Sequence, residues 1–87
     1  MTKLILLGTA GCHLCEQAEL IISACTGVEI ELIDIAEQQQ WQEKYAIRIP
    51  VLYHDVTEKE LGWPFEQQQA QIFIDTLREM ETNNHPI

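Results

Sequence analysis

Apolar and polar positions follow two different periods along the chain, and these periods predict short strands and amphipathic helices. An unbroken apolar run at residues 4–7 predicts a buried strand over residues 3–7. Apolar residues then recur at helical spacing and predict a first helix, with a stripe formed by Leu14, Ala18, Ile21, Ile22 and Cys25. Gly27 is expected to end this helix as its C′ residue.

The middle of the chain predicts a second strand and a second helix. Over residues 28–33, apolar residues alternate with two glutamates, so we expect a strand with one wet face. Asp34 and Glu37 have the spacing of an N-cap and an N3 residue. They predict a second helix, on which Trp41 and Tyr45 are interpreted as packing residues.

The last part of the chain predicts a hairpin and a final helix. Strands are expected over residues 51–53 and 58–61, with a turn around Asp55, and the charged second strand suits a sheet edge. Pro64 is expected at position N1 of the last helix. The predicted apolar face of that helix comprises Phe65, Gln69, Ile72, Phe73, Thr76, Leu77 and Met80. Residues 83–87 are expected to form a frayed tail.

Two cysteines, in the run Cys12-His13-Leu14-Cys15, stand where the first strand meets the first helix. Helical spacing brings both sulfurs to one side of the first turn, close enough to bond. Backbone N–H groups and the positive end of the helix dipole favour Cys12 as a thiolate, the form that attacks disulfides. We therefore predict Cys12 as the nucleophile and Cys15 as the resolving thiol. The alternative is a pair of small buried residues that happen to be three apart.

The order of predicted elements is βαβαββα. Two strands joined by a helix require a right-handed parallel crossover, whereas the last two strands form an antiparallel hairpin. A CxxC after the first strand of this pattern points to a thioredoxin-like fold. We expect one α/β domain over residues 1–87, a four-stranded mixed sheet flanked by three helices.

The chain resembles the thioredoxin-fold superfamily and, within it, the small glutaredoxin-like proteins of bacteria. The matching runs are Gly-Cys-His-Leu-Cys-Glu at residues 11–16, Tyr-Ala-Ile-Arg-Ile-Pro-Val-Leu at 45–52 and Gly-Trp-Pro-Phe at 62–65. The resemblance implies a cis peptide bond between Ile49 and Pro50 beside the CxxC, with the backbone of Ile49 turned toward a peptide or glutathione. An ordinary trans proline that starts a strand is the alternative.

Two features usual in glutaredoxins are replaced in this chain. Gly-Thr-Ala at residues 8–10 stands where a basic residue usually precedes the CxxC, and residues 61–65 replace a Gly-Gly turn. We therefore expect weak glutathione binding; glutathione is retained only as an alternative co-substrate, and no resident cofactor is expected. Substrate contacts are predicted for His13, Ile49, Pro50 and Trp63, although Trp63 packing on Phe65 or the sheet is equally consistent.

The charges beside the CxxC act in opposite directions. His13, when protonated, stabilises a thiolate at Cys12, whereas Glu16 repels it. Of the remaining candidates, Cys25 is expected in the core, His54 in an exposed turn and His85 in the tail. Zinc on the two CxxC thiols and a histidine would lack a fourth ligand, and an iron–sulfur cluster would have to bridge two chains. We predict no metal site.

Fourteen acidic residues against five basic ones give a net charge of −9, which disfavours nucleic acids and anionic membranes as partners. No apolar stretch approaches the ~18 residues of a membrane span, and the early first strand leaves no room for a signal peptide. Three cysteines, an odd number, fit a reducing compartment. We expect a cytoplasmic monomer.

Together these features predict a thiol–disulfide oxidoreductase of glutaredoxin-like type that acts on a disulfide-containing protein or a small thiol. Two alternatives come from other functional classes. One is a binding module that retains the fold without efficient turnover, and the other is a metal or iron–sulfur carrier.

Overall fold

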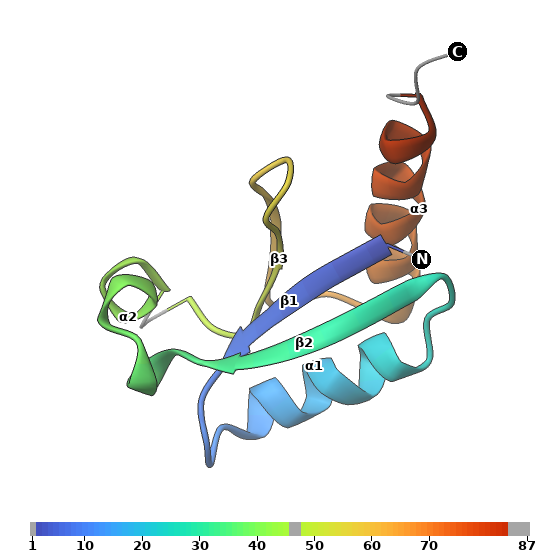
Figure 1. The fold of residues 1–87 in the computed structure, drawn as a ribbon. Helices are drawn as coiled ribbons and strands as arrows, with labels where there is room; N and C mark the ends of the chain where they lie inside the picture. Colours follow the sequence, from blue (N-terminus) through green and yellow to red (C-terminus); the bar gives the residue numbers. More distant parts are fainter. Residues whose placement is uncertain (1, 46–47, 84–87) are drawn as a thin grey trace.

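The computed structural model describes residues 2–45 and 48–83. The described residues form four strands and three α-helices, together with the short 3-10 helix η1, and Figure 1 shows how they are arranged. Their bounds are β1 (Thr2–Gly8), α1 (His13–Ser23), β2 (Val28–Asp34), η1 (Ile35–Glu37), α2 (Gln39–Tyr45), β3 (Val51–His54), β4 (Lys59–Gly62) and α3 (Gln67–Asn83). This order confirms the predicted α/β fold.

The four strands form one mixed sheet in the order β2-β1-β3-β4. Strand β1 pairs in parallel with β2, from Thr2 opposite Val28 to Gly8 opposite Asp34. It pairs antiparallel with β3, and β3 and β4 form the predicted antiparallel hairpin. Strands β2 and β4 are therefore the two edges, and the ends of β1 and β2 that lead into α1 and η1 lie side by side.

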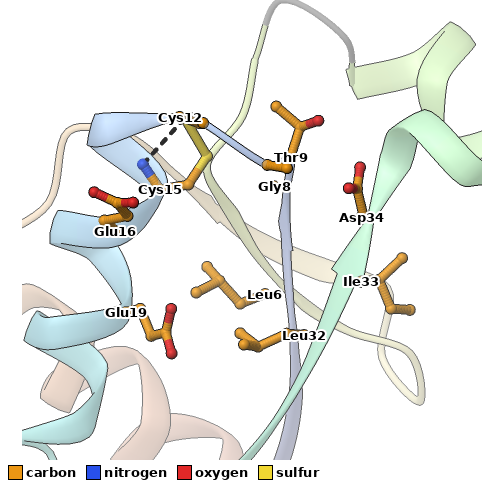
Figure 2. A pocket seen from close by; sticks show the side chains of 12 residues that line it. Leu6, Gly8, Thr9, Cys12, Cys15, Glu16, Glu19, Leu32, Ile33 and Asp34 are labelled. Atoms are coloured by element: carbon orange, nitrogen blue, oxygen red, sulfur yellow. Dashed lines mark hydrogen bonds between the residues drawn. A yellow bond between two sulfur atoms is a disulfide. The ribbon is translucent and has the colours of Figure 1, made fainter.

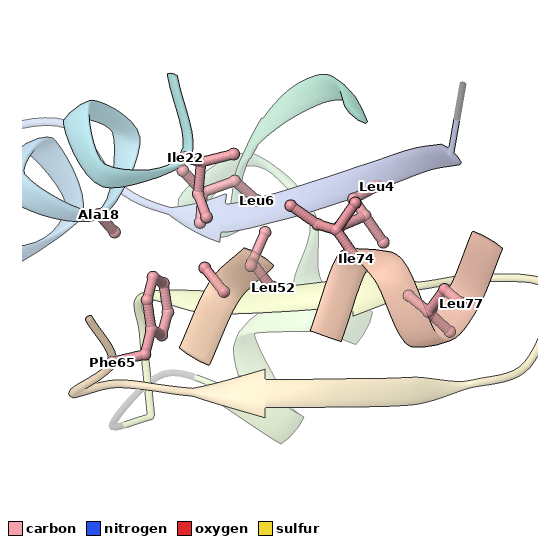
Figure 3. Close-up of a cluster of buried hydrophobic side chains, with 9 residues drawn as sticks. Leu4, Leu6, Ala18, Ile22, Leu52, Phe65, Ile74 and Leu77 are labelled. Atoms are coloured by element: carbon pink, nitrogen blue, oxygen red, sulfur yellow. The ribbon is translucent and has the colours of Figure 1, made fainter. Parts of the chain in front are cut away.

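Alternation along β1 divides the buried side chains between two faces of the sheet. Leu4 and Leu6 face α1 and α3, in the larger cluster drawn in Figure 3. That cluster consists of Leu4, Leu6, Ala18, Ile22, Leu52, Phe65, Ala70, Ile74 and Leu77. Leu7 faces the opposite side, where it packs with Ile35, Tyr45 and Val51 under α2. The sheet is thus covered on both faces, by α1 and α3 on one side and by η1 and α2 on the other.

The predicted stripe of α1 is confirmed except at its first position, because Ala18 and Ile22 are buried and Ile21 and Cys25 pack partly buried against the core. Leu14 is 46% exposed, and the buried residues of the helix are Cys15, Ala18 and Ile22. Cys15, one residue and about 100° further around the helix, takes the place predicted for Leu14, so the second CxxC sulfur lies on the core side of the helix. The prediction for Gly27 is also wrong, because α1 ends at Ser23 with Ala24 as its C-cap.

The starts of α2 and α3 also lie later than predicted. Asp34 caps η1, accepting a hydrogen bond from the N–H of Ala36 at 2.9 Å, and α2 begins only at Gln39. Pro64 is not the N1 residue of α3, which begins at Gln67. Glu66 occupies the cap position there, and its N–H donates to the Gln69 side chain at 2.8 Å.

The face that α3 turns toward the sheet differs in part from the predicted face. Ile72 is 58% exposed, and Gln69 and Thr76 are also exposed, so this part of the predicted face is wrong. The rest of that face is confirmed, since Leu77 is buried and Phe73 and Met80 are partly buried, whereas Ala70 and Ile74 are buried without having been predicted. Residues 84–87 of the predicted tail, including His85, lie outside the described residues.

His54 is not the exposed turn residue that the sequence suggested. It is the last residue of β3 and is 1% exposed. Its Nδ1 lies 2.8 Å from the hydroxyl of Thr57 in the β3–β4 turn. His54 is therefore part of the hairpin structure, on the far side of the fold from the CxxC end of β1 by strand register.

Candidate functional site

Cys12 and Cys15 form a disulfide at the start of α1, with Cα atoms 5.2 Å apart. Cys12 is the N-cap residue and has extended backbone angles, whereas Cys15 lies in the first helical turn. Cys15 is buried and Cys12 is half-buried. An incoming sulfur therefore has better access to Cys12 than to Cys15.

The N-cap position also determines the electrostatic surroundings of Cys12. Its Sγ accepts a hydrogen bond from the backbone N–H of Cys15 at 3.1 Å. Backbone N–H groups in the first turn have no partner within the helix, and they carry the positive end of the helix dipole. After reduction, this arrangement stabilises a thiolate on Cys12 and gives it the chemistry of a nucleophile.

Two glycines shape the segment that carries Cys12 from β1 to α1. A Cβ atom built on Gly8 would lie 3.0 Å from Cys15 Sγ, so only glycine fits there without displacing the sulfur. Gly11 has a φ of 76°, a left-handed conformation that glycine adopts freely. The first glycine thus permits the close approach of β1 to the disulfide, and the second permits the turn.

His13 and Glu16 lie together on the exposed side of the first helical turn. His13 Nδ1 is 3.6 Å from Glu16 Oε2, and their side chains are 91% and 68% exposed. An ion pair with this exposure is worth little energy. His13 thus lies beside Glu16. Its effect on the Cys12 thiolate and its contact with substrate stay predictions.

Pro50 and Trp63, both predicted substrate contacts, meet near the end of β1. Pro50 is buried and directly precedes Val51, which lies opposite Leu7 of β1. The N–H of Trp63 donates to the carbonyl of Pro50 at 3.2 Å. The Ile49–Pro50 peptide bond is cis, as is Trp63–Pro64. The register therefore brings this segment to the same end of the sheet as the CxxC.

The side chain of Trp63 packs against Phe65, as the alternative interpretation of the sequence allowed. The two rings meet edge to face with centroids 5.2 Å apart, and Phe65 itself is buried. Trp63 is half-buried, so part of its surface remains accessible beside Pro50. A packing role and a substrate contact are compatible for this residue.

A polar network that the sequence did not reveal holds the chain just before Ile49. The hydroxyl of Tyr45 donates to Glu60 Oε2 at 2.7 Å, and Arg48 pairs with the other oxygen of Glu60. These hydrogen bonds lower the pKa of Glu60, while burial and the Glu60 contact raise the pKa of Tyr45 to about 12. No spacing rule links α2 to β4, so only the assembled sheet could identify this network.

A cavity of about 260 Å³ adjoins the disulfide on the side of β2. Figure 2 shows Glu19 of α1 and Asp34 of β2 on opposite sides of it, with Leu6 and Leu32 between them. Cys12 and Cys15 close one end. The edge strand β2 forms one wall of this space, which depends on the pairing of β1 with β2 and was not predicted from the sequence.

Cys25, the third cysteine, lies apart from the disulfide. It is half-buried and packs against the larger core cluster, as expected, with its Sγ 3.5 Å from the carbonyl of Ile21. Burial, and secondarily the charge of Asp75, raise the pKa of its thiol. A raised pKa lowers the thiolate fraction, so Cys25 has the character of an unreactive structural cysteine.

The described part of the chain was compared with the requirements of a metal site and of a membrane-spanning helix, and it meets neither. Among residues 2–45 and 48–83, no three His, Cys, Asp or Glu side chains group as a metal site would require. No helix in these ranges combines the length and hydrophobicity needed to cross a bilayer.

Comparison with known proteins identifies a family and two structures of a solved bacterial protein to which this chain is similar. The family model of the glutaredoxin-like domain (DUF836) matches residues 3–75. The X-ray structure of target protein XcR50 from X. campestris superimposes with a TM-score of 0.76 and 29% identity, over 84% of this chain and 96% of that one. Its solution structure gives 0.74 and 27%, over 84% and 92%. No curated protein matches the chain.

Proposed function

Because the chain belongs to the family of glutaredoxin-like domains, whose model spans residues 3–75, we propose that it is a thiol–disulfide oxidoreductase. The thioredoxin-like fold predicted from the sequence is confirmed by its solved structural neighbours. The observation that carries the proposal is the Cys12–Cys15 disulfide, with Cys12 as the N-cap of α1 and its Sγ bonded to a helical N–H.

The first step of the proposed reaction starts from the reduced protein. The Cys12 thiolate attacks one sulfur of a substrate disulfide, forming a bond from Cys12 Sγ to that sulfur and breaking the substrate S–S bond. The second substrate sulfur leaves as a thiolate and takes up a proton from solvent. The product is a mixed disulfide in which Cys12 links the protein to its substrate.

Cys15 completes the transfer of two electrons. Its thiol loses a proton, and the thiolate attacks Cys12 Sγ, forming the Cys12–Cys15 bond and releasing the remaining substrate sulfur as a thiol. The substrate is then reduced and the protein oxidised. A dithiol, or two equivalents of a monothiol such as glutathione, resets the protein in the reverse sense. The short Cα separation of 5.2 Å suits the resolving step.

Substrate docking is proposed at the edge formed by Ile49, Pro50 and Trp63. A backbone strand of substrate placed there would lie next to Cys12, with the accessible part of Trp63 beside it and His13 at the opposite rim. The carbonyl of Pro50 already accepts from the Trp63 N–H, and the N–H of Ile49 donates to the carbonyl of Tyr45 at 3.2 Å, so the backbone group proposed to pair with substrate is the Ile49 carbonyl. The expected substrate is a disulfide in a protein or in a small thiol.

Trapping the mixed disulfide tests the proposal. In the Cys15→Ser variant, the resolving thiol is absent and the adduct at Cys12 should accumulate when a peptide disulfide is added. Mass spectrometry under non-reducing conditions should find one peptide per chain, attached to Cys12. The Cys12→Ser variant is the matched control and should carry no peptide. An adduct found on Cys25 in both variants would contradict the assignment.

A further inference from the structure

The cavity beside the disulfide has an apolar floor and an acidic rim. Leu6 and Leu32, which lie opposite each other in β1 and β2, form the floor, and Leu32 is 56% exposed. Glu19 stands on the α1 side and Asp34 on the β2 side, as Figure 2 shows. At about 260 Å³, the space is below the usual range for a whole drug-sized ligand, and it suits a single long side chain.

The charge of the cavity is one-sided. Its described lining includes the carboxylates of Glu16, Glu19 and Asp34 but no lysine or arginine. His13 faces Glu16 at 3.6 Å and, when protonated, offsets part of that charge. Glu19 on α1 and Asp34 on β2 leave the rest of the rim negative in a chain whose net charge is −9.

Lysine and arginine match this combination of surfaces. Each has an aliphatic stem that packs on apolar surface and a cationic head that stays near water or carboxylates. A stem lying over Leu6 and Leu32 would bring its head between Glu19 and Asp34. An anionic side chain, or the anionic glutathione molecule, would meet two carboxylates in the same place.

Building on the proposed function, we propose that this cavity is a specificity pocket for a lysine or arginine next to the reacting cysteine of a peptide or protein disulfide. Because the disulfide closes one end of the cavity, a substrate sulfur bonded to Cys12 lies beside the pocket. The side chain that can enter the pocket is therefore that of the residue next to the reacting cysteine. The pocket lies on the β2 side of the CxxC, whereas Pro50 lies on the β3 side. The substrate class is therefore a basic segment that carries a disulfide.

The reaction is the two-step thiol–disulfide exchange at Cys12 and Cys15, and a small dithiol reduces the protein again. Binding of the cationic side chain adds no bond-breaking step. It raises the rate at which Cys12 and the substrate sulfur meet, and it orients the substrate for attack. Because Glu19 and Asp34 are near the surface, added salt should weaken the preference.

Paired peptide substrates test the pocket. Two peptide disulfides of equal length carry either lysine or glutamine beside each cysteine, and each oxidises the pre-reduced protein in separate single-turnover experiments. The measured quantity is the ratio of second-order rate constants, lysine peptide over glutamine peptide. The same ratio is measured with dithiothreitol in place of the protein. Dividing by it removes the difference in intrinsic reactivity between the two peptide disulfides.

The test variant is Glu19→Gln/Asp34→Asn, in which asparagine can still cap η1. Its matched control is Glu29→Gln/Glu31→Gln, which removes the same charge from exposed positions on β2 outside the pocket. The inference predicts that the test variant lowers the ratio about fivefold, as expected for two exposed charge pairs. The control should change the ratio less than twofold.

Three results would overturn the inference. Equal ratios in wild type and test variant would show that the pocket does not select charge. Equal losses in test and control variants would assign the preference to net charge alone. If the wild type reduces neither peptide, the proposed oxidoreductase function is itself contradicted. The absolute rate constants distinguish this outcome from a loss of charge preference alone. Circular dichroism of both double variants establishes that they are folded.

Discussion

The backbone of Gly8 lies directly against the sulfur of Cys15. A Cβ atom at Gly8 would lie 3.0 Å from Cys15 Sγ and 3.2 Å from Cys15 Cβ. Such a contact forces the neighbour to move, and Cys15 is anchored in the first turn of α1. The end of β1 and the resolving thiol are thus fitted to each other, while Cys12 lies outside this contact.

Gly8→Ala is therefore expected to disturb Cys15 and to leave Cys12 largely unchanged. Overpacking of this kind costs about 1–3 kcal/mol of unfolding free energy, measurable by urea denaturation. Displacement of the resolving sulfur should slow release of a bound peptide from Cys12 about tenfold. The alkylation rate of reduced Cys12 should change less than about twofold.

Gly62→Ala is the control for this variant. Gly62 lies at the end of β4, and a Cβ atom there meets nothing within 4 Å. Its peptide release rate should match the wild type. If the two alanine variants release peptide equally fast, the Gly8 contact does not constrain the resolving step.

Because Tyr45 and Glu60 share a hydrogen bond, we expect their contribution to the free energy of unfolding to change with pH in both the acid and the alkaline range. The pKa of Glu60 is lowered, mainly by the Tyr45 hydrogen bond. Glu60 therefore contributes stability above its ordinary value of 4.5, and this contribution is lost as pH falls through its lowered folded value. The pKa of Tyr45 is raised from 10.0 to about 12, so its contribution is present below pH 10.0 and is lost as pH rises toward about 12.

Tyr45→Phe removes this hydrogen bond and keeps the ring that packs under the sheet. We expect a loss of about 1 kcal/mol at neutral pH, together with a flatter alkaline limb of the stability curve. Denaturation at a series of pH values checks both. Glu29→Gln, at an exposed β2 position, serves as the control and should change the curve little. An unchanged alkaline limb in Tyr45→Phe would contradict the role of this network.

The three cysteines should react in a fixed order. In the reduced protein, Cys12 should be alkylated first, with a titration midpoint below the free-thiol value of about 8.5. Cys25 should react last, because burial raises the pKa of its thiol. Asp75 also raises this pKa, so Asp75→Asn should lower the midpoint of Cys25 and leave that of Cys12 unchanged. Peptide mapping after timed alkylation at several pH values measures all three sites.

Much of the fold could be predicted because its signals are local. The apolar run of β1, the CxxC at the helix start and the charged edge strand β4 all depend on neighbours in the sequence. The faces of the helices were harder to predict. Apolar residues stand consecutively at 72–74 in α3, so a stripe through Ile72 and one through Ile74 fit the sequence equally well. Packing on the sheet selects the second, because Ile74 is buried and Ile72 is exposed.

The site was predictable only in part, for a related reason. The cysteine pair is a contiguous motif, and its place at the start of a helix follows from the pattern on either side. The cavity and the Glu60 network depend on pairing between distant segments: Asp34 lies opposite Gly8, and Glu60 lies under α2. Such contacts are set by sheet register and burial, and no spacing within the chain encodes them.

The central claim is that Cys12 and Cys15 transfer two electrons to a disulfide. Its most direct measurement mixes pre-reduced protein with one equivalent of a peptide disulfide, without any other reductant, and counts thiols on both partners after acid quenching. The account predicts that the peptide gains two thiols while the protein loses two, with the new bond mapped between Cys12 and Cys15 and Cys25 still alkylated. If the protein retains all three thiols and the peptide stays oxidised, the claim is contradicted.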